Sequence, residues 1–347
     1  MSFSIFEFYQ YSTLQNIQVD LIAAQDIERE VKGYSESLIS GIREKEGFNI
    51  QNPETLQIEN NNISYLFFEG YTERVKDLKN WQIENGVLRD REDRINPYQS
   101  NILVFEANSK VYGIVFSGIN RAKAITKDCF PAETWGHVLP VENKITEDLL
   151  YWIFKRFIDT PRESLATEYQ LHVTALESYM GKTRDNVNAM RGEGSRISTI
   201  LGTLAFLFNN EELRAIRPAI QHGNEKVLLE IGLTGTFKTW SNAYRGQHFR
   251  TITGQRKENA IAIFIFLKIL PSLAECYKYH KDKDQWSPQL KVDFLKRLGT
   301  MIRDEVDSVL IKIEQENLDI DENEGILDSD YEEFELEIED DDDEVIE

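Results

Sequence analysis

Two stretches of alternating apolar and polar positions carry the clearest structural signal in the chain. Residues 101–107 (NILVFEA) and 110–116 (KVYGIVF) both alternate, and Asn108-Ser109-Lys110 joins them. Alternation places every second side chain on one face of a strand, and a short polar link lets two strands run antiparallel. The sequence therefore predicts a β-hairpin here. A second hairpin is predicted from KVLLEIGL (226–233) and TGTFKTWSNAY (234–244), turning across Gly232–Gly235.

Further elements follow from β-branched or aromatic runs and from apolar residues at helical spacing. Strands are predicted at 3–11, 17–23, 63–72 and 169–176. Helices are predicted at 23–47, 73–88 (with a stop at Asn85-Gly86), 147–159, 195–220 (with a break near Asn209-Asn210 and Pro218), 258–279 and 287–317. The helix at 147–159 has Thr146 as its N-cap and acids in its first turn, and Ser287-Pro288 suits the start of the last helix.

These elements do not alternate strictly between strand and helix and show no internal repeat, which favours an α+β fold over a doubly wound parallel sheet. We expect antiparallel hairpins in a mixed sheet, an α-rich C-terminal half and a disordered acidic tail. The expected division is a β-rich α+β domain at 1–160, an α-rich domain at 161–313 and the tail at 314–347. The segment IDTPRES (158–164) is the linker-like stretch at the first boundary.

Charge is concentrated in two regions of the chain. Its 347 residues carry a net charge of −21, with 60 Asp and Glu against 39 Lys and Arg. Residues 314–347 hold 19 of those acids and no Lys or Arg, so the first 313 residues are nearly neutral at −2. A like-charge block repels itself and cannot bury a core, which predicts a mobile tail. By contrast, residues 181–257 hold 12 Lys and Arg against 6 Asp and Glu, a surplus of six positive charges.

Composition argues against several classes of protein. Cys129 and Cys276 are too few and too far apart for a disulfide framework or a cysteine-rich zinc site. The N-terminal MSFSIFEFYQYS lacks a basic segment followed by a long apolar one, so we expect no signal peptide and a location in the reducing cytoplasm. The longest apolar run, AIAIFIFLKILPSLA, is interrupted by Lys268 and Pro271 and falls short of the roughly 18 uncharged apolar residues of a membrane span. It predicts a buried helix and no membrane association.

The segment LESYMGKT (176–183) matches the second half of a phosphate-binding P-loop. The full motif is G-x-x-x-x-G-K-[ST], in which the first glycine allows a tight turn around the phosphates and the lysine reaches them. Leu176 occupies the position of that first glycine, and no later apolar strand ends in an Asp that would anchor Mg²⁺. The segment is therefore interpreted as a strand end followed by a turn, and no nucleotide or other cofactor is expected. Lys182 and Arg184 remain as candidate phosphate contacts.

Two further segments combine basic residues with glycine or aromatic residues. RGEGSRIST (191–199) places two arginines beside two glycines ahead of a predicted helix, where backbone N–H groups can meet an anion. NAYRGQHFRTITGQRK (242–257) interleaves basic residues with Tyr244, His248 and Phe249, which suits phosphate contacts and stacking on unpaired bases. The alternatives are a flexible glycine loop and a solvated loop with Phe249 in the core. The candidate nucleic-acid contacts are Lys182, Arg184, Arg191, Arg196, Arg245, Arg250, Arg256 and Lys257.

Catalytic signatures are incomplete throughout the chain. The five histidines are scattered, without His-x-His or HExxH spacing, and no G-x-S-x-G elbow occurs. Cys276 and His280 stand one helical turn apart, but a nucleophile pair also needs a third group that orients the base. We therefore expect no catalytic residues and no metal site, and interpret this pair as structural. A divergent metal-dependent nuclease stays open, because its carboxylates would be diffuse in sequence.

The distribution of charge predicts a non-enzymatic, nucleic-acid-binding accessory protein. Its basic stretch would contact the phosphates of DNA or RNA, and its acidic tail would compete for that surface or dock on a protein partner. DNA metabolism, or a phage-defence or mobile-element system, would be the setting for such a factor. The alternative is a protein-interaction or assembly module that uses the helix at 287–317 and the tail, with an oligomer as its product.

Overall fold

The computed structural model describes residues 1–323 apart from 33, 78, 80, 82–86, 162, 186 and 195–199. The chain divides into two compact units, Met1–Gly299 and Thr300–Glu347, each of which is described by itself. Residue 314, where the acidic tail was expected to begin, lies inside helix α9 (Pro288–Asn323). Residues 324–347 of the predicted tail lie outside the described residues.

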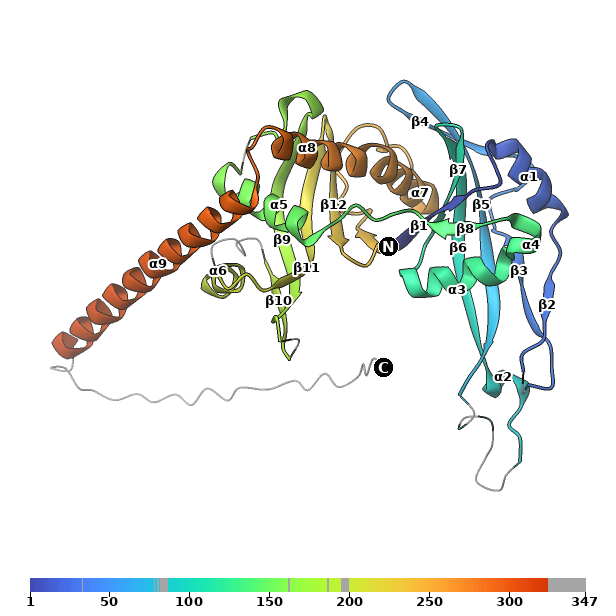
Figure 1. Ribbon diagram of the computed structural model, residues 1–347, viewed down its shortest axis with the longest axis horizontal. Coiled ribbons are helices and arrows are strands. Elements are labelled where there is room, and N and C mark those ends of the chain that lie inside the picture. Colours follow the sequence, from blue (N-terminus) through green and yellow to red (C-terminus); the bar gives the residue numbers. More distant parts are fainter. Residues whose placement is uncertain are drawn as a thin grey trace. The chain divides into compact units, whose positions relative to one another are not determined.

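The first unit combines antiparallel strands with helices, which confirms the α+β prediction (Figure 1). The strands are β1 (Ser2–Phe8), β2 (Ile27–Arg29), β3 (Leu38–Glu44), β4 (Glu54–Ile58), β5 (Asn61–Val75), β6 (Ile95–Ala107), β7 (Lys110–Val115), β8 (Val138–Pro140), β9 (Leu171–Lys182), β10 (Ala189–Glu193), β11 (Glu212–His222), β12 (Glu225–Gly232) and β13 (Phe237–Thr239). The helices are α1 (Leu14–Ala23), α2 (Arg91–Arg94), α3 (Ile119–Cys129), α4 (Ala132–Trp135), α5 (Glu147–Asp159), α6 (Leu201–Phe208), α7 (Gly254–Phe264), α8 (Leu270–Asp282) and α9, with a short 3-10 helix η2 (Thr167–Tyr169) and a π-helical segment η4 (Ile265–Ile269).

Strand β1 links strands from both halves of this unit. The order of hydrogen-bonded neighbours is β10-β9-β11-β12-β13-β1-β7-β6-β5-β3-β2, with β4 on β5 and β8 on β1, and each of these pairs is antiparallel. Ser2 and Phe3 pair with β13, whereas Ser4 to Phe8 pair with β7. The domain boundary near residue 160 stays a prediction, but β1 hydrogen-bonds to strands from both sides of that position.

Elements with a strong local signal form where the sequence predicts them. The first hairpin is β6–β7, and its turn residues Asn108 and Ser109 have φ of 53° and 58°. Positive φ at both residues is the geometry of a type I′ turn, whose twist matches that of the two strands. Helix α5 begins after Thr146, whose side chain accepts a hydrogen bond from the Leu149 N–H. The second predicted hairpin is β12–β13.

The strand predicted at 17–23 is wrong, because these residues belong to helix α1. Leu14, Ile17 and Leu21 recur at helical spacing and are buried together in the core of the N-terminal half. The Thr13 hydroxyl caps the helix by accepting from the Asn16 N–H. Both signals are present in the sequence, but the short apolar run IQVDLIA obscures them because short runs of this kind suit a strand as well as a helix.

The helix predicted at 23–47 is also wrong, because this segment forms strands β2 and β3. Ser40 to Glu44 pair with β5, and the Ser40 hydroxyl donates to the Asp128 carbonyl at 2.9 Å. Pairing with a strand distant in sequence outweighs the approximate helical spacing of this segment. Of the helix predicted at 73–88, the first three residues complete β5, and much of the remainder lies outside the described residues.

The helix predicted at 195–220 is correct only in its middle. Helix α6 covers Leu201–Phe208, and β11 begins at Glu212. Pro218 lies within β11, between its neighbours β9 and β12, at a shift of the register with β9. A bulge is where a sheet tolerates proline, which cannot donate a ladder hydrogen bond. Residues 195–199 lie outside the described residues.

Helices α7 and α8 and the segment η4 form one continuous run, Gly254–Asp282. By length and composition this run meets the criteria for a candidate membrane span. An 18-residue window tolerates Lys268, whereas a count of uninterrupted apolar residues does not. Half of the apolar window is buried inside the protein, and a core helix meets the same criteria. The π-helical segment ends two residues before Pro271, which lacks the N–H for a regular helical hydrogen bond.

Candidate nucleic-acid interface

The P-loop-like segment is part of a strand, as the sequence interpretation expected. Gly181 and Lys182 are the last residues of β9 and pair with both β10 and β11. A Cβ at Gly181 would lie 2.2 Å from Phe206 Cζ and 2.6 Å from the Glu212 carbonyl oxygen, so packing requires glycine here. The side chain of Lys182 is half-buried and has no hydrogen bond or ion pair with the described residues.

Arg184 follows this strand end and already has an anionic partner. Its Nη2 lies 2.7 Å from Glu147 Oε1, and its Nε donates to the Asn210 carbonyl at 2.7 Å. Glu147 is the first residue of α5, so the guanidinium links that helix to the end of β9. A phosphate group would have to displace Glu147 in order to bind Arg184.

The glycine-containing segment 191–199 is described only in part. Arg191 lies in β10 with its Nη2 2.9 Å from Glu193 Oε2, and Glu193 also accepts from Arg217 at 2.7 Å. Both side chains of the Arg191–Glu193 pair are more than half exposed, and exposed ion pairs contribute little to stability. Arg196 lies among residues 195–199, outside the described residues, so its environment is not assigned.

A buried carboxylate organises the basic loop that follows β13. Glu225 is 3% exposed and accepts a hydrogen bond from the Tyr244 hydroxyl. It also accepts from the backbone N–H groups of Gln247, at 3.1 Å, and His248, at 3.3 Å. Its Oε1 also lies 2.9 Å from His248 Nδ1. Burial and the bond to Glu225 raise the pKa of Tyr244. A Cβ on Gly246 would lie only 1.9 Å from Glu225 Oε2. The backbone of the loop can therefore approach the carboxylate this closely only because residue 246 is glycine.

The aromatic residues of this loop are used mainly for packing. Tyr244 is 5% exposed, and Phe249 is fully buried with its ring centroid 5.8 Å from that of Phe264 in α7. Neither ring can stack on a base, so the alternative that placed Phe249 in the core is correct. The side chain of His248 stays 34% exposed, and its contact with Glu225 fixes the orientation of its ring.

Arg245 and Arg250 of the loop, and Lys257 near the start of α7, have no carboxylate partner in the part of the chain that the structure describes. Arg245 donates to the carbonyls of Asn242 and Tyr244, at 2.7 and 3.0 Å. The Lys257 Nζ lies 5.4 Å from the centroid of the Tyr244 ring. The side chain of Arg250 is exposed and makes no hydrogen bond or ion pair with described residues.

Tertiary contacts bring Lys226 next to the cations of the loop and turn Arg256 away from them. Lys226 of β12 exchanges backbone hydrogen bonds of 2.7 and 2.9 Å with Arg245, so it lies directly beside the loop. Lys226 is not among the contacts predicted from the sequence, because only strand pairing brings it beside Arg245. Arg256 turns to β4, where its Nη2 lies 2.8 Å from Glu54 Oε1 and donates to the Gly47 carbonyl at 2.7 Å. We call the remaining four residues the basic loop surface: Lys226, Arg245, Arg250 and Lys257.

The start of helix α7 lies beside Arg250 and carries Lys257. Arg250 and Lys257 line a surface hollow of about 530 Å³, together with Thr253 and Glu258. Thr253 is the N-cap of α7 but makes no capping hydrogen bond, and the first turn of the helix contains no acid. The unpaired N–H groups of a first helical turn favour anions, and the two cations add to that preference. The hollow can therefore receive a phosphate group, although Glu258 limits its positive charge.

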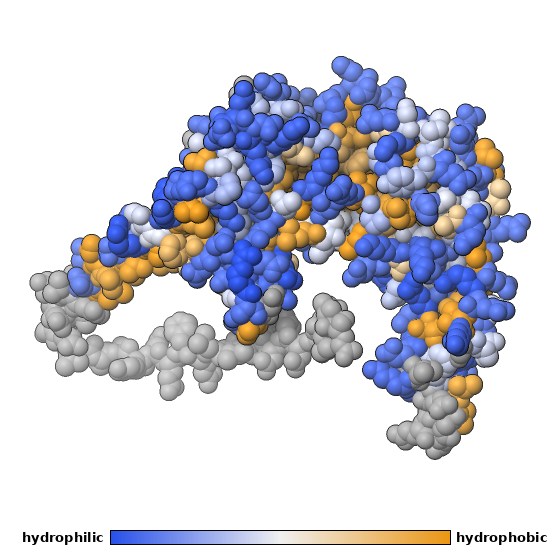
Figure 2. Space-filling view, in the orientation of Figure 1, coloured by the Kyte–Doolittle hydropathy of each residue, from blue (hydrophilic) through white to orange (hydrophobic). Residues whose placement is uncertain are grey.

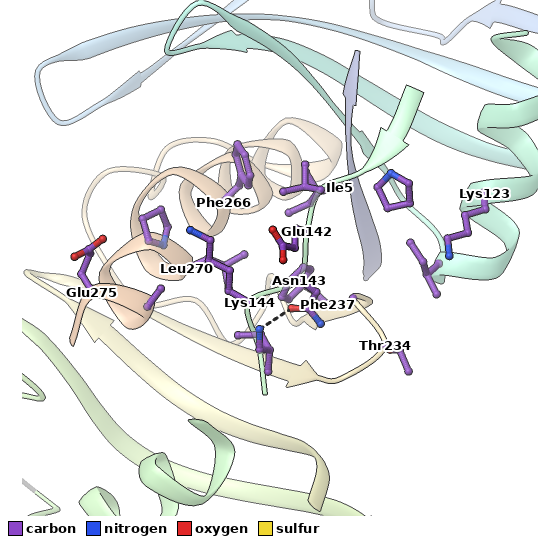
Figure 3. A pocket seen from close by; sticks show the side chains of 17 residues that line it. Ile5, Lys123, Glu142, Asn143, Lys144, Thr234, Phe237, Phe266, Leu270 and Glu275 are labelled. Carbon is purple, nitrogen blue, oxygen red and sulfur yellow. Dashed lines mark hydrogen bonds between the residues drawn. The ribbon is translucent and has the colours of Figure 1, made fainter. Parts of the chain in front are cut away.

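A separate pocket of about 450 Å³ opens elsewhere in the first unit (Figure 3). Apolar side chains such as Ile5, Phe237 and Phe266 form much of its wall, and Asn143 holds the segment after β8 by donating to the Gly232 carbonyl at 3.0 Å. The charged residues that line it are Lys123, Glu142, Lys144 and Glu275. None of the predicted nucleic-acid contacts is among the residues that line this pocket.

Cys276 and His280 are both buried beside the core. His280 Nε2 lies 2.6 Å from the Leu165 carbonyl oxygen, and its ring packs at 5.4 Å from the Trp152 ring. Burial raises the pKa of the Cys276 thiol to about 12 and lowers the pKa of His280. A thiol that ionises so reluctantly is a poor nucleophile, which agrees with the structural interpretation of this pair.

Neither a metal site nor a match to known proteins assigns a function to the described residues. Within the described ranges, no group of three or more His, Cys, Asp or Glu side chains is placed to hold a metal ion, so the nuclease alternative has no assigned carboxylates there. Comparison with protein-family models and with curated proteins finds no match for this chain.

Proposed function

We propose that the chain binds the phosphate backbone of nucleic acid through the basic loop surface. The observation that carries this proposal is that its four cations have no carboxylate partner among the described residues, although the first 313 residues are nearly neutral overall. Arg184, Arg191 and Arg256, by contrast, are each paired with a glutamate. Cations left without a partner in a neutral body favour a polyanion, because neutralising phosphates releases their counterions.

The contacts would be made with phosphates more than with bases. Tyr244 and Phe249 are buried, which leaves His248 as the loop ring with access to a base. Cations and the N–H groups at the start of α7 recognise a phosphate without reading its neighbours in the sequence. We therefore expect little sequence preference and a steep dependence of affinity on salt.

Other predicted residues have secondary roles in this proposal. Lys182, at the end of β9, would contact a longer nucleic acid outside the loop. The acidic segment at 324–347 would compete with nucleic acid for the basic loop surface, or dock on a protein partner. A cytoplasmic accessory factor of DNA metabolism, or of a phage-defence or mobile-element system, is the role that we propose for such a protein.

The proposal is tested by reversing the two cations of the hollow. Arg250→Glu/Lys257→Glu should weaken binding of a fluorescent oligonucleotide by at least about tenfold, and should make the slope of log affinity against log salt shallower by about 0.7 per lost phosphate contact for a single strand. Lys278→Glu/Lys296→Glu is the matched control, because it changes the net charge equally at exposed positions away from the loop. Equal affinities and slopes for the two double variants would contradict the proposal.

The role of the acidic segment needs a separate measurement. A chain that ends at Asn323 keeps the whole of α9 and removes the segment that follows. If that segment competes for the basic loop surface, the shorter chain should bind the oligonucleotide more tightly at low salt, and the difference should shrink as salt screens the competition. Unchanged affinity at low salt would leave the basic loop surface without an internal competitor.

A further inference from the structure

Helix α9 carries a stripe of apolar residues in the unit that begins at Thr300. Ile302, Val306, Val309 and Ile313 follow one another at spacings of four, three and four residues. At about 100° per residue, these four positions share one face of the helix. Val306, Val309 and Ile313 are exposed, and Figure 2 shows hydrophobic residues at the surface along this helix. We call these four residues the α9 seam.

The preceding turns of the same helix are different. Phe294 and Leu298 are fully buried within the unit Met1–Gly299, whereas the seam has no such cover among the described residues. Exposed β-branched residues that repeat at 4-3-4 spacing are the pattern of a coiled-coil surface. An apolar stripe of this kind on a single helix stabilises the helix only when a partner covers it.

We propose that the α9 seam pairs with the same seam of a second copy of the chain, as an antiparallel two-helix coiled coil. In this register Ile302 packs against the partner's Ile313, and Val306 packs against the partner's Val309. Two-fold symmetry repeats each contact, so the four seam residues of each copy cover those of the other. This register therefore pairs apolar residues of one copy with apolar residues of the other along the whole seam, and a second copy is the occupant that we propose. This proposal does not depend on nucleic-acid binding.

The charges beside the seam fit the antiparallel orientation. Glu305 and Lys312 are seven residues apart and lie along the same side of the seam. Antiparallel pairing places Glu305 opposite the partner's Lys312, and symmetry forms this ion pair twice. Parallel pairing would place Glu305 next to the partner's Leu310 instead. Neither Glu305 nor Lys312 has an ion pair within the described residues, so both are available to a second copy.

The acidic sequence that follows the seam also favours the antiparallel orientation. Residues 314–347 carry 19 acidic residues and no Lys or Arg. In a parallel pair, the two acidic segments would start roughly 10 Å apart, which is the usual distance between packed helix axes. In the antiparallel register they start about 20 Å apart, because residue 314 lies opposite the partner's residue 301 and each residue adds about 1.5 Å. That separation exceeds two Debye lengths of about 8 Å at physiological salt, so much of the repulsion is screened.

The length of the seam sets the strength of the pairing. The four apolar positions of each helix form two kinds of contact, and symmetry repeats each of them once. This seam is shorter than that of a stable independent coiled coil. The pairing should therefore be reversible and depend on protein concentration. Analytical ultracentrifugation of the full chain at physiological salt, from low micromolar to submillimolar concentration, measures this directly. The average mass should rise from 40.4 kDa towards twice that value.

Two matched substitutions separate the seam from the rest of the helix. Val306→Asp places a charge in the seam, whereas Ile311→Asp places the same charge at a position that is 54% exposed and about 180° from Ile302 around the helix. Val306→Asp should remain monomeric at every concentration, and Ile311→Asp should dimerise as the unmodified chain does. A chain that stays monomeric without any substitution, or two variants that dimerise equally, would overturn the proposal.

Charge reversal tests the orientation independently. Glu305→Lys and Lys312→Glu should each weaken the dimer by at least about tenfold, because each places like charges opposite one another twice. The double variant Glu305→Lys/Lys312→Glu should restore the affinity of the unmodified chain, since both pairs form again with their signs exchanged. A double variant that is weaker than either single variant would show that the two helices are not antiparallel in this register.

Discussion

Replacing Glu225 by alanine should both destabilise the protein and weaken its binding to nucleic acid. The carboxylate is 3% exposed and is bonded to the Tyr244 hydroxyl, to the His248 ring and to two loop N–H groups. A buried polar group that loses its partner costs about 1–3 kcal/mol. The hydroxyl of Tyr244 is buried and cannot turn to water, whereas His248 is partly exposed and can. We therefore expect Glu225→Ala to lower the free energy of unfolding by about 3 kcal/mol, most of it from Tyr244 and the loop backbone.

Urea denaturation followed by tryptophan fluorescence measures this loss. Glu225→Gln keeps an acceptor for the loop N–H groups and should cost less, about 1 kcal/mol. Glu133→Ala is the control for charge, because this exposed glutamate of α4 has no hydrogen bond or ion pair with described residues and its removal should leave the midpoint nearly unchanged. A loss below about 1 kcal/mol for Glu225→Ala would refute the view that this carboxylate holds the loop.

The direction in which Glu225→Ala changes the affinity for the oligonucleotide discriminates between two explanations of binding, total charge and loop geometry. Removing a negative charge beside a basic surface should strengthen phosphate binding if only the total charge matters. If the position of Arg245 and Arg250 matters, Glu225→Ala should weaken binding, because the loop that carries these two residues loses its shape. Tighter binding by a variant that is still folded would refute the geometric explanation and leave the charge count as the cause.

Other contacts make local predictions that thermal or urea unfolding can check. Gly181→Ala should lower the free energy of unfolding by about 2–3 kcal/mol, because the new Cβ would collide with Phe206 and a strand carbonyl. A variant as stable as the unmodified chain would contradict this packing. Ser109→Gly should raise it by about 0.5–1 kcal/mol, since glycine adopts the positive φ beside Asn108 without strain, and a loss would argue against the type I′ turn. The pKa of His280 is lowered by burial, so its contribution to stability is complete above the unfolded value of about 6.5 and is lost as the pH falls below it. His280→Gln should therefore show a smaller fall in the urea midpoint between pH 7.5 and pH 5 than the unmodified chain, and an equal fall would assign the effect to other groups.

Local signals in the sequence were sufficient for some elements and not for others. The turn at Asn108-Ser109 and the cap at Thr146 each involve residues a few positions apart, and both form as predicted. The segment 23–47 has approximate helical spacing, yet it forms strands because β5 offers it a partner for its backbone. The energy of that pairing depends on a segment nearly thirty residues away, so no local pattern contains it.

The candidate site divides in the same way. The sequence by itself determined that positive charge concentrates between residues 181 and 257 and that negative charge concentrates after 313. Only the tertiary structure decided which cations are already neutralised: Arg256 meets Glu54 across 202 positions, whereas Lys226 joins Arg245 through strand pairing. Charge can be counted along a chain, but its availability depends on distances of a few ångströms, which are set when segments remote in sequence pack together.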